Sequence, residues 1–296
     1  MAEPLALESS HVPPARPPRV WPVFVDVALA LLGSIVTSAI VITVALLVMG
    51  GDLTEPQEGL TRLASSFLGV LLLLAPGQVT FLAAAIAPAL LSARGFALRL
   101  ALRRPAVPFG PVLLLVVGTL GVQGLIQLGS PLLGEPSDGV RRLMEILTST
   151  SGVEAVLVAL GMSLIPGICE ELFFRGYVQS RLMERFGPAR GILLASVAFA
   201  AAHVDPQHAI AVFPLGLWIG AIAHVTRSTW PAIAAHVLNN LVGIAQVNLG
   251  DAERVFIPPD DPLKLGSFGV AALAGIAGLL LARRAHARSP APASVR

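Results

Sequence analysis

The sequence predicts an all-α membrane protein, a polytopic bundle of about eight transmembrane helices. Of its 296 residues, 55 % are hydrophobic and only 13 % are charged. A soluble domain of this length carries about 25 % charged residues to cover its surface. Such an apolar chain needs an apolar solvent in addition to water, and a lipid bilayer supplies it.

Eight segments are apolar enough to be interpreted as spans, because a helix needs about 20 apolar residues to cross a bilayer. The three in the middle of the chain are less regular, since charged or histidine side chains interrupt or border them. The segments are 27–50, 63–93, 106–134, 155–169, 191–204, 208–226, 228–250 and 265–282. We find no internal repeat and no strand-like alternation, so we expect one helical membrane domain over residues 20–283.

Both ends of the chain are predicted to be tails on the cytoplasmic side. Residues 1–19 are rich in proline and mixed in charge, and we expect disorder there. Residues 284–296 form a basic segment. Arginines concentrate in this segment and in the loops after the second and fourth spans, whereas the loops after the first and seventh spans are acidic or mixed. By the positive-inside rule this alternation places both termini in the cytoplasm.

Composition also narrows the possible partners and compartments. The net charge is only +2, and no basic block is interleaved with aromatic residues, so nucleic acid is not an expected partner. Cys169 is the only cysteine, which excludes an intrachain disulfide. Alanine, arginine and proline are plentiful while Lys264 is the only lysine, a composition typical of GC-rich bacterial genomes. We therefore expect a protein of the bacterial cytoplasmic membrane, surrounded by lipid.

The first chemical motif is Glu170-Glu171-x-x-x-Arg175, which follows directly on an apolar run. Inserting an ionised side chain at the bilayer centre costs roughly 2.5–3.5 kcal/mol of free energy, so we expect these residues to have partners or a function. Neighbours on a helix point about 100° apart, so both glutamates cannot face one small site. Glu171 and Arg175 have the spacing of an ion pair, which leaves Glu170 free. Alternatively, all three lie at the cytoplasmic interface.

The second motif is Phe199-x-x-x-His203, in which a histidine closes a helix of small residues. Small residues allow helices to approach closely and a cavity to form beside them. A hydrogen-bonded structural role is the alternative for His203. His208 follows across Asp205 and Pro206, at a spacing that suits no single helix face, and we interpret it as a loop residue.

The third motif is Trp230-Pro231 followed by His236-x-x-x-Asn240. Pro231 is typical of the first turn of a helix, where its missing N–H is not needed. His236 and Asn240 then lie one turn apart on the same face, with Asn239 as a weaker alternative partner. A hydrogen-bonding pair between helices is the structural alternative.

Together these motifs place a carboxylate, two histidines and an amide on three helical regions. Such groups can supply a general base, a second proton carrier or metal ligand, and donors for an oxyanion. The three ordered motifs, over residues 150–245, resemble those of the CPBP intramembrane proteases. That family includes the type II CAAX prenyl proteases such as Ras-converting enzyme, and bacterial abortive-infection and bacteriocin-immunity proteins.

The resemblance implies an intramembrane endopeptidase acting on a membrane-associated protein or peptide. It implies that Glu170 activates water with the help of His203, that His236 and Asn240 stabilise the oxyanion, and that Glu171 and Arg175 shape the site. Family members are commonly called metalloproteases. Glu170, His203 and His236 could hold a divalent metal such as zinc, and the reaction could equally proceed without one.

Two further expectations concern geometry and alternatives. A converging site requires a continuous helix from about Val153 to Met183, which would carry Glu170 well inside the bilayer; we expect its cavity to open to the cytoplasm. The alternatives are a non-catalytic scaffold or immunity protein and a transporter coupled to protons or cations.

Overall fold

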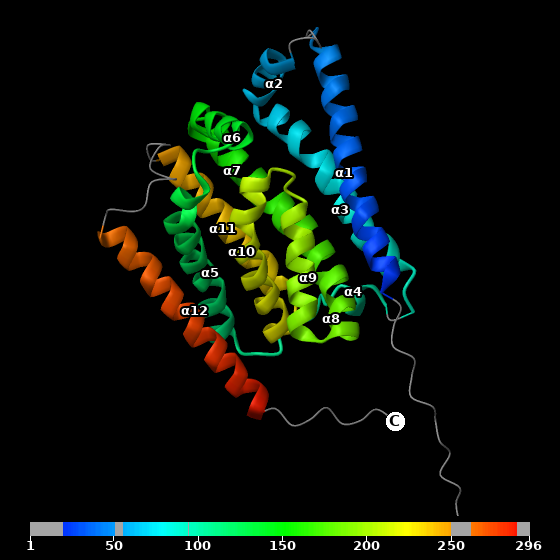
Figure 1. The fold of residues 1–296 in the computed structure, drawn as a ribbon, viewed down its shortest axis with the longest axis vertical. Helices are drawn as coiled ribbons and strands as arrows, with labels where there is room; N and C mark the ends of the chain where they lie inside the picture. The colour runs from blue at the N-terminus through cyan, green and yellow to red at the C-terminus, as the bar shows by residue number, and fades with distance from the viewer. Residues whose placement is uncertain (1–19, 51–55, 94, 250–261, 289–296) are drawn as a thin grey trace, which may run out of the picture.

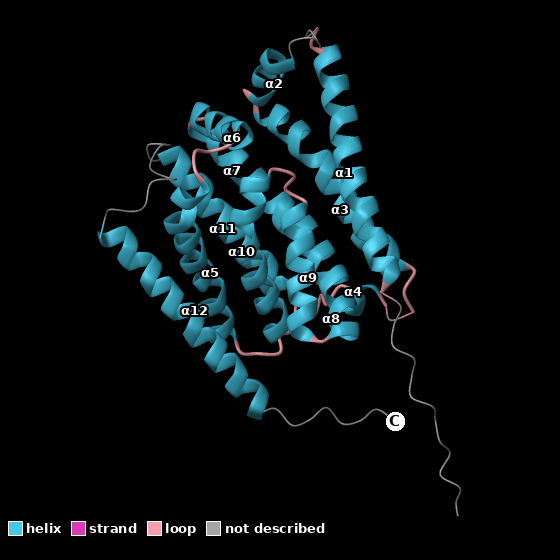
Figure 2. Ribbon diagram, viewed as in Figure 1, coloured by secondary structure: helices cyan, strands magenta, loops and turns pink. Residues whose placement is uncertain are grey.

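A computed structural model describes residues 20–50, 56–93, 95–249 and 262–288. In these ranges the chain forms helices joined by loops, with no strand (Figure 2), which confirms the predicted all-α class. In chain order the helical elements are α1 (Trp21–Val48), α2 (Pro56–Ala64), α3 (Phe67–Leu90), α4 (Phe96–Arg99), α5 (Phe109–Gly129), η1 (Ser130–Leu133), α6 (Asp138–Ser149), α7 (Gly152–Glu170), η2 (Glu171–Gln179), α8 (Ser180–Phe186), α9 (Pro188–Ala201), α10 (Pro206–Thr226), α11 (Trp230–Leu249) and α12 (Pro262–Arg288).

Each of the eight predicted apolar segments contains a helix. Within the described ranges, six helical segments are long and apolar enough to cross a membrane. The other two are α9, which has only 14 residues, and α11, which carries the polar side chains of His236, Asn239 and Asn240. The chain is therefore a polytopic helical bundle, and the count of eight spans stays a prediction.

Successive long helices run in opposite directions, so α1 begins and α12 ends at the same end of the bundle (Figure 1). We call this the basic end. Two loops meet there, because Arg103 Nε donates to Arg227 O at 2.6 Å and Thr229 Oγ1 donates to Leu100 O at 2.7 Å. The arginines described at this end are Arg99, Arg103, Arg104, Arg181, Arg185, Arg190, Arg227, Arg283 and Arg284.

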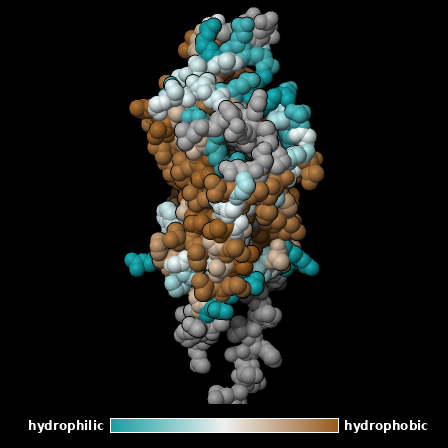
Figure 3. Space-filling view, turned by 90° about the vertical axis from the view of Figure 1, so that its left-hand side faces the viewer, coloured by the Kyte–Doolittle hydropathy of each residue, from teal (hydrophilic) through white to brown (hydrophobic). Residues whose placement is uncertain are grey.

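The opposite end carries α2 and α6 (Figure 1), and we call it the α6 end. Its charges are mixed and mainly acidic. They are Glu58, Arg62, Glu135, Asp138, Arg141, Arg142, Glu145, Glu154, Asp205 and Lys264. On the face shown in Figure 3, hydrophobic side chains predominate between the two ends, and hydrophilic ones gather toward the ends. This is the surface expected of a protein with its middle in lipid.

Two packed clusters fill the half of the bundle nearest the basic end. In the first, Phe173 and Phe174 of η2 pack against Phe81 of α3 and Phe199 of α9, with ring centroids 5.0–5.6 Å apart. The second cluster joins α5, α10, α11 and α12, and it includes Leu115, which is fully buried. These clusters fix the helices that carry the three motifs.

The segment around the first motif is one continuous helical run. α7, η2 and α8 follow one another without a break from Gly152 to Phe186, which confirms the helix predicted over Val153–Met183. The sequence did not predict that residues 171–179 are π-helical. All nine residues of this stretch are buried, and π-helical turns are frequent at functional sites.

The described residues cover the two predicted tails to different extents. The N-terminal segment, residues 1–19, lies outside the described residues. Residues 284–288 continue helix α12, which ends at Arg288, and residues 289–296 lie outside the described residues, so the predicted tail stays a prediction. Apolar residues of α12 contribute to the cluster shared with α5 as far as Ala285.

The contact between α5 and α12 depends on small residues. A Cβ atom at Gly118 would lie 2.4 Å from the Cα atom of Gly275, closer than atoms can approach. Glycine lets the two backbones touch, as is common between membrane helices.

We predict that Gly118→Ala lowers the stability of the bundle by about 1–3 kcal/mol, because the added methyl group forces α5 and α12 apart. The matched control is Gly110→Ala on the same helix, where an added Cβ meets nothing within 4 Å. Thermal unfolding in detergent measures both. Equal melting temperatures for the two variants would contradict this packing.

Candidate active site

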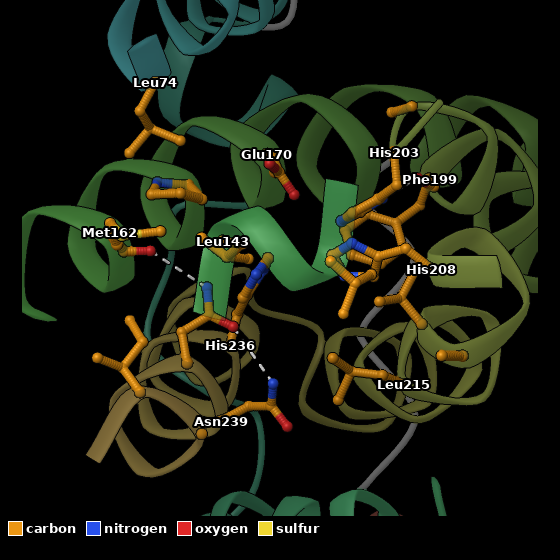
Figure 4. A pocket seen from close by; sticks show the side chains of 18 of the residues that line it. Leu74, Leu143, Met162, Glu170, Phe199, His203, His208, Leu215, His236 and Asn239 are labelled. Carbon is orange, nitrogen blue, oxygen red and sulfur yellow. Dashed lines mark hydrogen bonds between the residues drawn. The ribbon is translucent and has the colours of Figure 1, made fainter. Parts of the chain in front are cut away.

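A cavity of about 600 Å³ lies between the helices that carry the three motifs (Figure 4). Its walls come from α1, α3, α5, α6, α7, α9, α10 and α11. The predicted site residues that line it are Glu170, His203, His236, Asn239 and Asn240. The other two, Glu171 and Arg175, are buried outside the lining.

Glu170 is the carboxylate of the cavity. Its side chain is buried, and Oε1 accepts a hydrogen bond from Gln78 Nε2 of α3 at 2.8 Å. Its other oxygen, Oε2, is buried without a hydrogen-bond partner. The carboxylate is therefore held through one oxygen, and the second is available to a small molecule in the cavity.

Glu171 has a different role, as the helix geometry predicts. Its Oε1 accepts from Arg175 Nη1 at 3.0 Å and from His236 Nδ1 at 2.7 Å. Arg175 Nη2 donates in addition to Gly216 O of α10 at 3.1 Å. The predicted ion pair is therefore present, fully buried, and it joins η2 to α10 and α11. Glu171 Oε2 also has no partner, but this residue does not line the cavity.

The ring of Phe199 contacts both the buried arginine and the two histidines. The guanidinium carbon of Arg175 lies 4.3 Å from the ring centroid, within range of a cation–π interaction. The rings of His203 and His236 lie 5.1 and 5.8 Å from the same ring. Phe199 thus packs against both imidazoles and against the guanidinium of Arg175.

His203 stands in the turn that follows α9, and its ring has a defined orientation. Nδ1–H donates to Phe199 O at 3.0 Å, so Nε2 is the nitrogen that carries the lone pair in the neutral ring. The ring of His208 lies 4.8 Å away. Figure 4 shows Glu170, His203, His208 and His236 around the same part of the cavity.

The interpretation of His208 as a loop residue is wrong. Asp205 caps α10, since its Oδ1 accepts from His208 N at 2.8 Å, and Pro206 occupies the first helical turn. Hydrogen bonds from the Ser137 side chain and from the His208 backbone lower the pKa of the Asp205 carboxyl. The Asp-Pro pair is a typical helix start, so this signal was present in the sequence.

The third motif lies on α11 with both predicted partners facing the cavity. His236 is fixed through Nδ1 by Glu171, which leaves Nε2 as its free nitrogen. Asn240 Nδ2 lies 3.4 Å from Met162 O, a long hydrogen bond that leaves the amide available. Asn239 donates to Asn240 Oδ1 at 3.2 Å and so orients it.

Residues outside the three motifs also contribute polar groups to the cavity. Gln78 on α3, and Gln123 and Gln127 on α5, are buried in its lining, each with a side-chain oxygen that has no hydrogen-bond partner. These glutamines lie outside the three motifs, which predicted no role for them. A buried amide within an otherwise apolar span was the signal that could have found them.

The metal ligands expected from the sequence are Glu170, His203 and His236. Among the described residues, no three His, Cys, Asp or Glu side chains form a group that could hold a metal ion. Both histidines have Nδ1 engaged within the protein and Nε2 free, as metal-binding histidines do, so it is the placement of the three side chains that does not fit a metal here. No step of the reaction described below passes through a metal.

The fold and the site together define a class. The protein is an integral membrane protein whose ionisable side chains surround a cavity inside an apolar helical bundle. Residues 152–242 match the family described as type II CAAX prenyl endopeptidase Rce1-like, which confirms the resemblance carried by the three motifs. The match points to protease activity. No curated protein and no solved structure matches the chain.

The two neighbouring glutamates offer a matched test of stability. We predict that Glu171→Gln lowers stability by about 3–5 kcal/mol, because it leaves the buried charge of Arg175 uncompensated. Glu170→Gln keeps the hydrogen bond to Gln78 and should unfold within about 1 kcal/mol of the wild type. Thermal unfolding in detergent measures both variants. A lower melting temperature for Glu170→Gln than for Glu171→Gln would contradict these separate roles.

Proposed function

We propose that this protein is an intramembrane endopeptidase in which Glu170 activates a water molecule. The observation that supports it most is the free Oε2 of Glu170, buried in a cavity that also holds two oriented imidazoles and an amide. Burying an ionisable group inside an apolar membrane bundle is energetically costly, so such a group usually has a function. The match over residues 152–242 supports the same reaction class.

The first step is attack by water on the scissile carbonyl. Glu170 Oε2 takes one proton from the water while the water oxygen bonds to the carbonyl carbon. The lone pair of His203 Nε2 accepts a hydrogen bond from the second O–H and holds the water in place. The carbonyl electron pair moves to oxygen and forms a tetrahedral oxyanion.

The second step is collapse of that intermediate. The oxyanion accepts hydrogen bonds from Asn240 Nδ2 and, when the ring carries a second proton, from His236 Nε2. As the carbonyl reforms, the carbon–nitrogen bond breaks and Glu170 returns its proton to the leaving nitrogen. The products are a carboxyl terminus and an amino terminus, and Glu170 is again a carboxylate.

Glu171 and Arg175 position the reacting groups from outside the cavity lining, and Phe199 does so from within it. Glu171 fixes the tautomer of His236, and Arg175 compensates the charge of Glu171. Phe199 carries the carbonyl that orients His203. The cavity needs such support, because a catalytic group displaced by about 1 Å loses much of its effect.

We predict that Glu170→Gln lowers proteolysis by about 10²–10⁴-fold while the protein stays folded, because the amide cannot accept the proton. Purified enzyme is reconstituted with membrane proteins of the source cells, and new amino termini are identified by mass spectrometry. Glu145→Gln, an exposed change on α6, is the matched control. The same new termini at the same rate in both variants would remove Glu170 from the mechanism.

Metal dependence gives a separate prediction. Because Glu170, His203 and His236 do not form a metal-binding group here, we expect proteolysis to stay within about twofold of its starting rate after exhaustive chelation. Loss of activity on chelation, with recovery on adding zinc, would show instead that the three side chains rearrange around a metal.

A further inference from the structure

The cavity occupies only the half of the bundle toward the α6 end. Each wall helix contributes residues from that half or from its middle. On α5, which runs toward the α6 end, the lining begins at Gln123; on α10, which runs away from it, the lining stops at Leu215. On α11 the lining extends from His236 up to Val247, near the end of that helix at the α6 end.

The other half of the bundle is closed by packed side chains. Phe173, Phe174 and Tyr177 fill the space between α1, α3 and η2, and Ile219 and Ile222 fill the space between α5, α10 and α12. All five side chains are 2 % exposed or less. A substrate therefore has no route to Glu170 from the basic end.

Helix α6 borders the cavity with its apolar face. Val140, Leu143, Met144 and Leu147 recur at helical spacing and line the cavity, while Asp138, Arg141 and Glu145 are exposed. This amphipathic helix thus forms one wall of the cavity at that end, with its charged side chains exposed.

Two amide side chains hold α6 in place. At its N-cap, Ser137 N–H donates to Gln207 Oε1 at 2.7 Å, and Gln207 Nε2 donates to Leu133 O and Glu135 O in the segment just before α6, at 3.0 and 2.9 Å. At its end, Asn248 Nδ2 donates to Leu147 O at 2.6 Å. Both amides belong to helices of the site, α10 and α11, so the position of α6 is coupled to the cavity walls.

The charges at the two ends indicate the side of the membrane toward which the cavity lies. Arginines concentrate at the basic end, whereas the α6 end is mixed and mainly acidic. Under the positive-inside rule the basic end faces the cytoplasm. The cavity then lies toward the non-cytoplasmic side, which differs from the cytoplasmic opening expected from the sequence.

The chemistry of the lining limits what can enter. Among the described residues that line the cavity there is no lysine or arginine, and Glu170 is the one acid. A terminal carboxylate near the scissile bond would therefore have no permanently cationic side chain among these residues to pair with. The unpartnered oxygens of Gln78, Gln123 and Gln127 are acceptors that suit the backbone N–H groups of an extended polypeptide.

We propose that the cavity accepts an internal, uncharged and extended stretch of a membrane-anchored polypeptide that enters from the non-cytoplasmic side. This rests on the proposed function and adds to it the side of entry and the class of substrate. The scissile bond lies near the outer half of the bilayer, where the cavity wall supplies amide acceptors and apolar contacts.

The side of entry is tested by cysteine modification of the full chain in its membrane, in a Cys169→Ala background. Ser38→Cys reports on the cavity, Ser149→Cys on the α6 end and Ala189→Cys on the basic end. A small, membrane-impermeant methanethiosulfonate added outside intact cells should modify the cysteines at 38 and 149 and spare the one at 189. Modification at 38 only in inside-out vesicles, or from neither side, overturns the proposal.

The substrate class is tested with single-span reporter proteins carrying an uncharged apolar segment beside the span. We expect Glu170-dependent cleavage when the segment lies on the non-cytoplasmic side, and a loss of about tenfold or more when a lysine is placed within it. Preferential cleavage on the cytoplasmic side overturns the proposal. If the cysteines react as expected but no reporter is cleaved, the proposed protease function fails and the orientation of the cavity stands.

Discussion

The buried carboxylate of Glu171 is the interaction on which the rest of the site depends. It accepts from Arg175 one turn along the same helical run and from His236 on α11. Arg175 extends the network to Gly216 on α10. A buried charge pair of this kind adds little net stability, but removing one partner is costly because the other charge is left unpaired. Its value lies in fixing three helices in one arrangement.

That arrangement gives adjacent, chemically identical residues separate roles. Glu171 compensates Arg175 within the protein, whereas Glu170 faces the cavity with one oxygen held by Gln78 and the other free. The π-helical stretch that begins at Glu171 buries every residue from 171 to 179, so the helix can pack on all sides while Glu170, just before it, lines open space.

The sequence predicted those parts of the fold and site that follow from local periodicity and from the cost of burying charge. The apolar segments, the long helix through Glu170, the Glu171–Arg175 pair and the shared face of His236 and Asn240 were all predictable in this way. Three features were not. The π-helical geometry has no local signature, and the contacts of Gln78 and of His236 with the two glutamates depend on helix packing over 92 and 65 residues of separation. His208 was misplaced because the capping signal of Asp205-Pro206 was not used.

The central claim is that Glu170, and not Glu171, holds a reactive water. An experimental structure at a resolution that shows ordered solvent tests this most directly. We expect a water about 2.6–3.2 Å from both Glu170 Oε2 and His203 Nε2, and no water at Glu171. A Glu170 carboxylate whose second oxygen is bound by another side chain, with no solvent beside it, would contradict it.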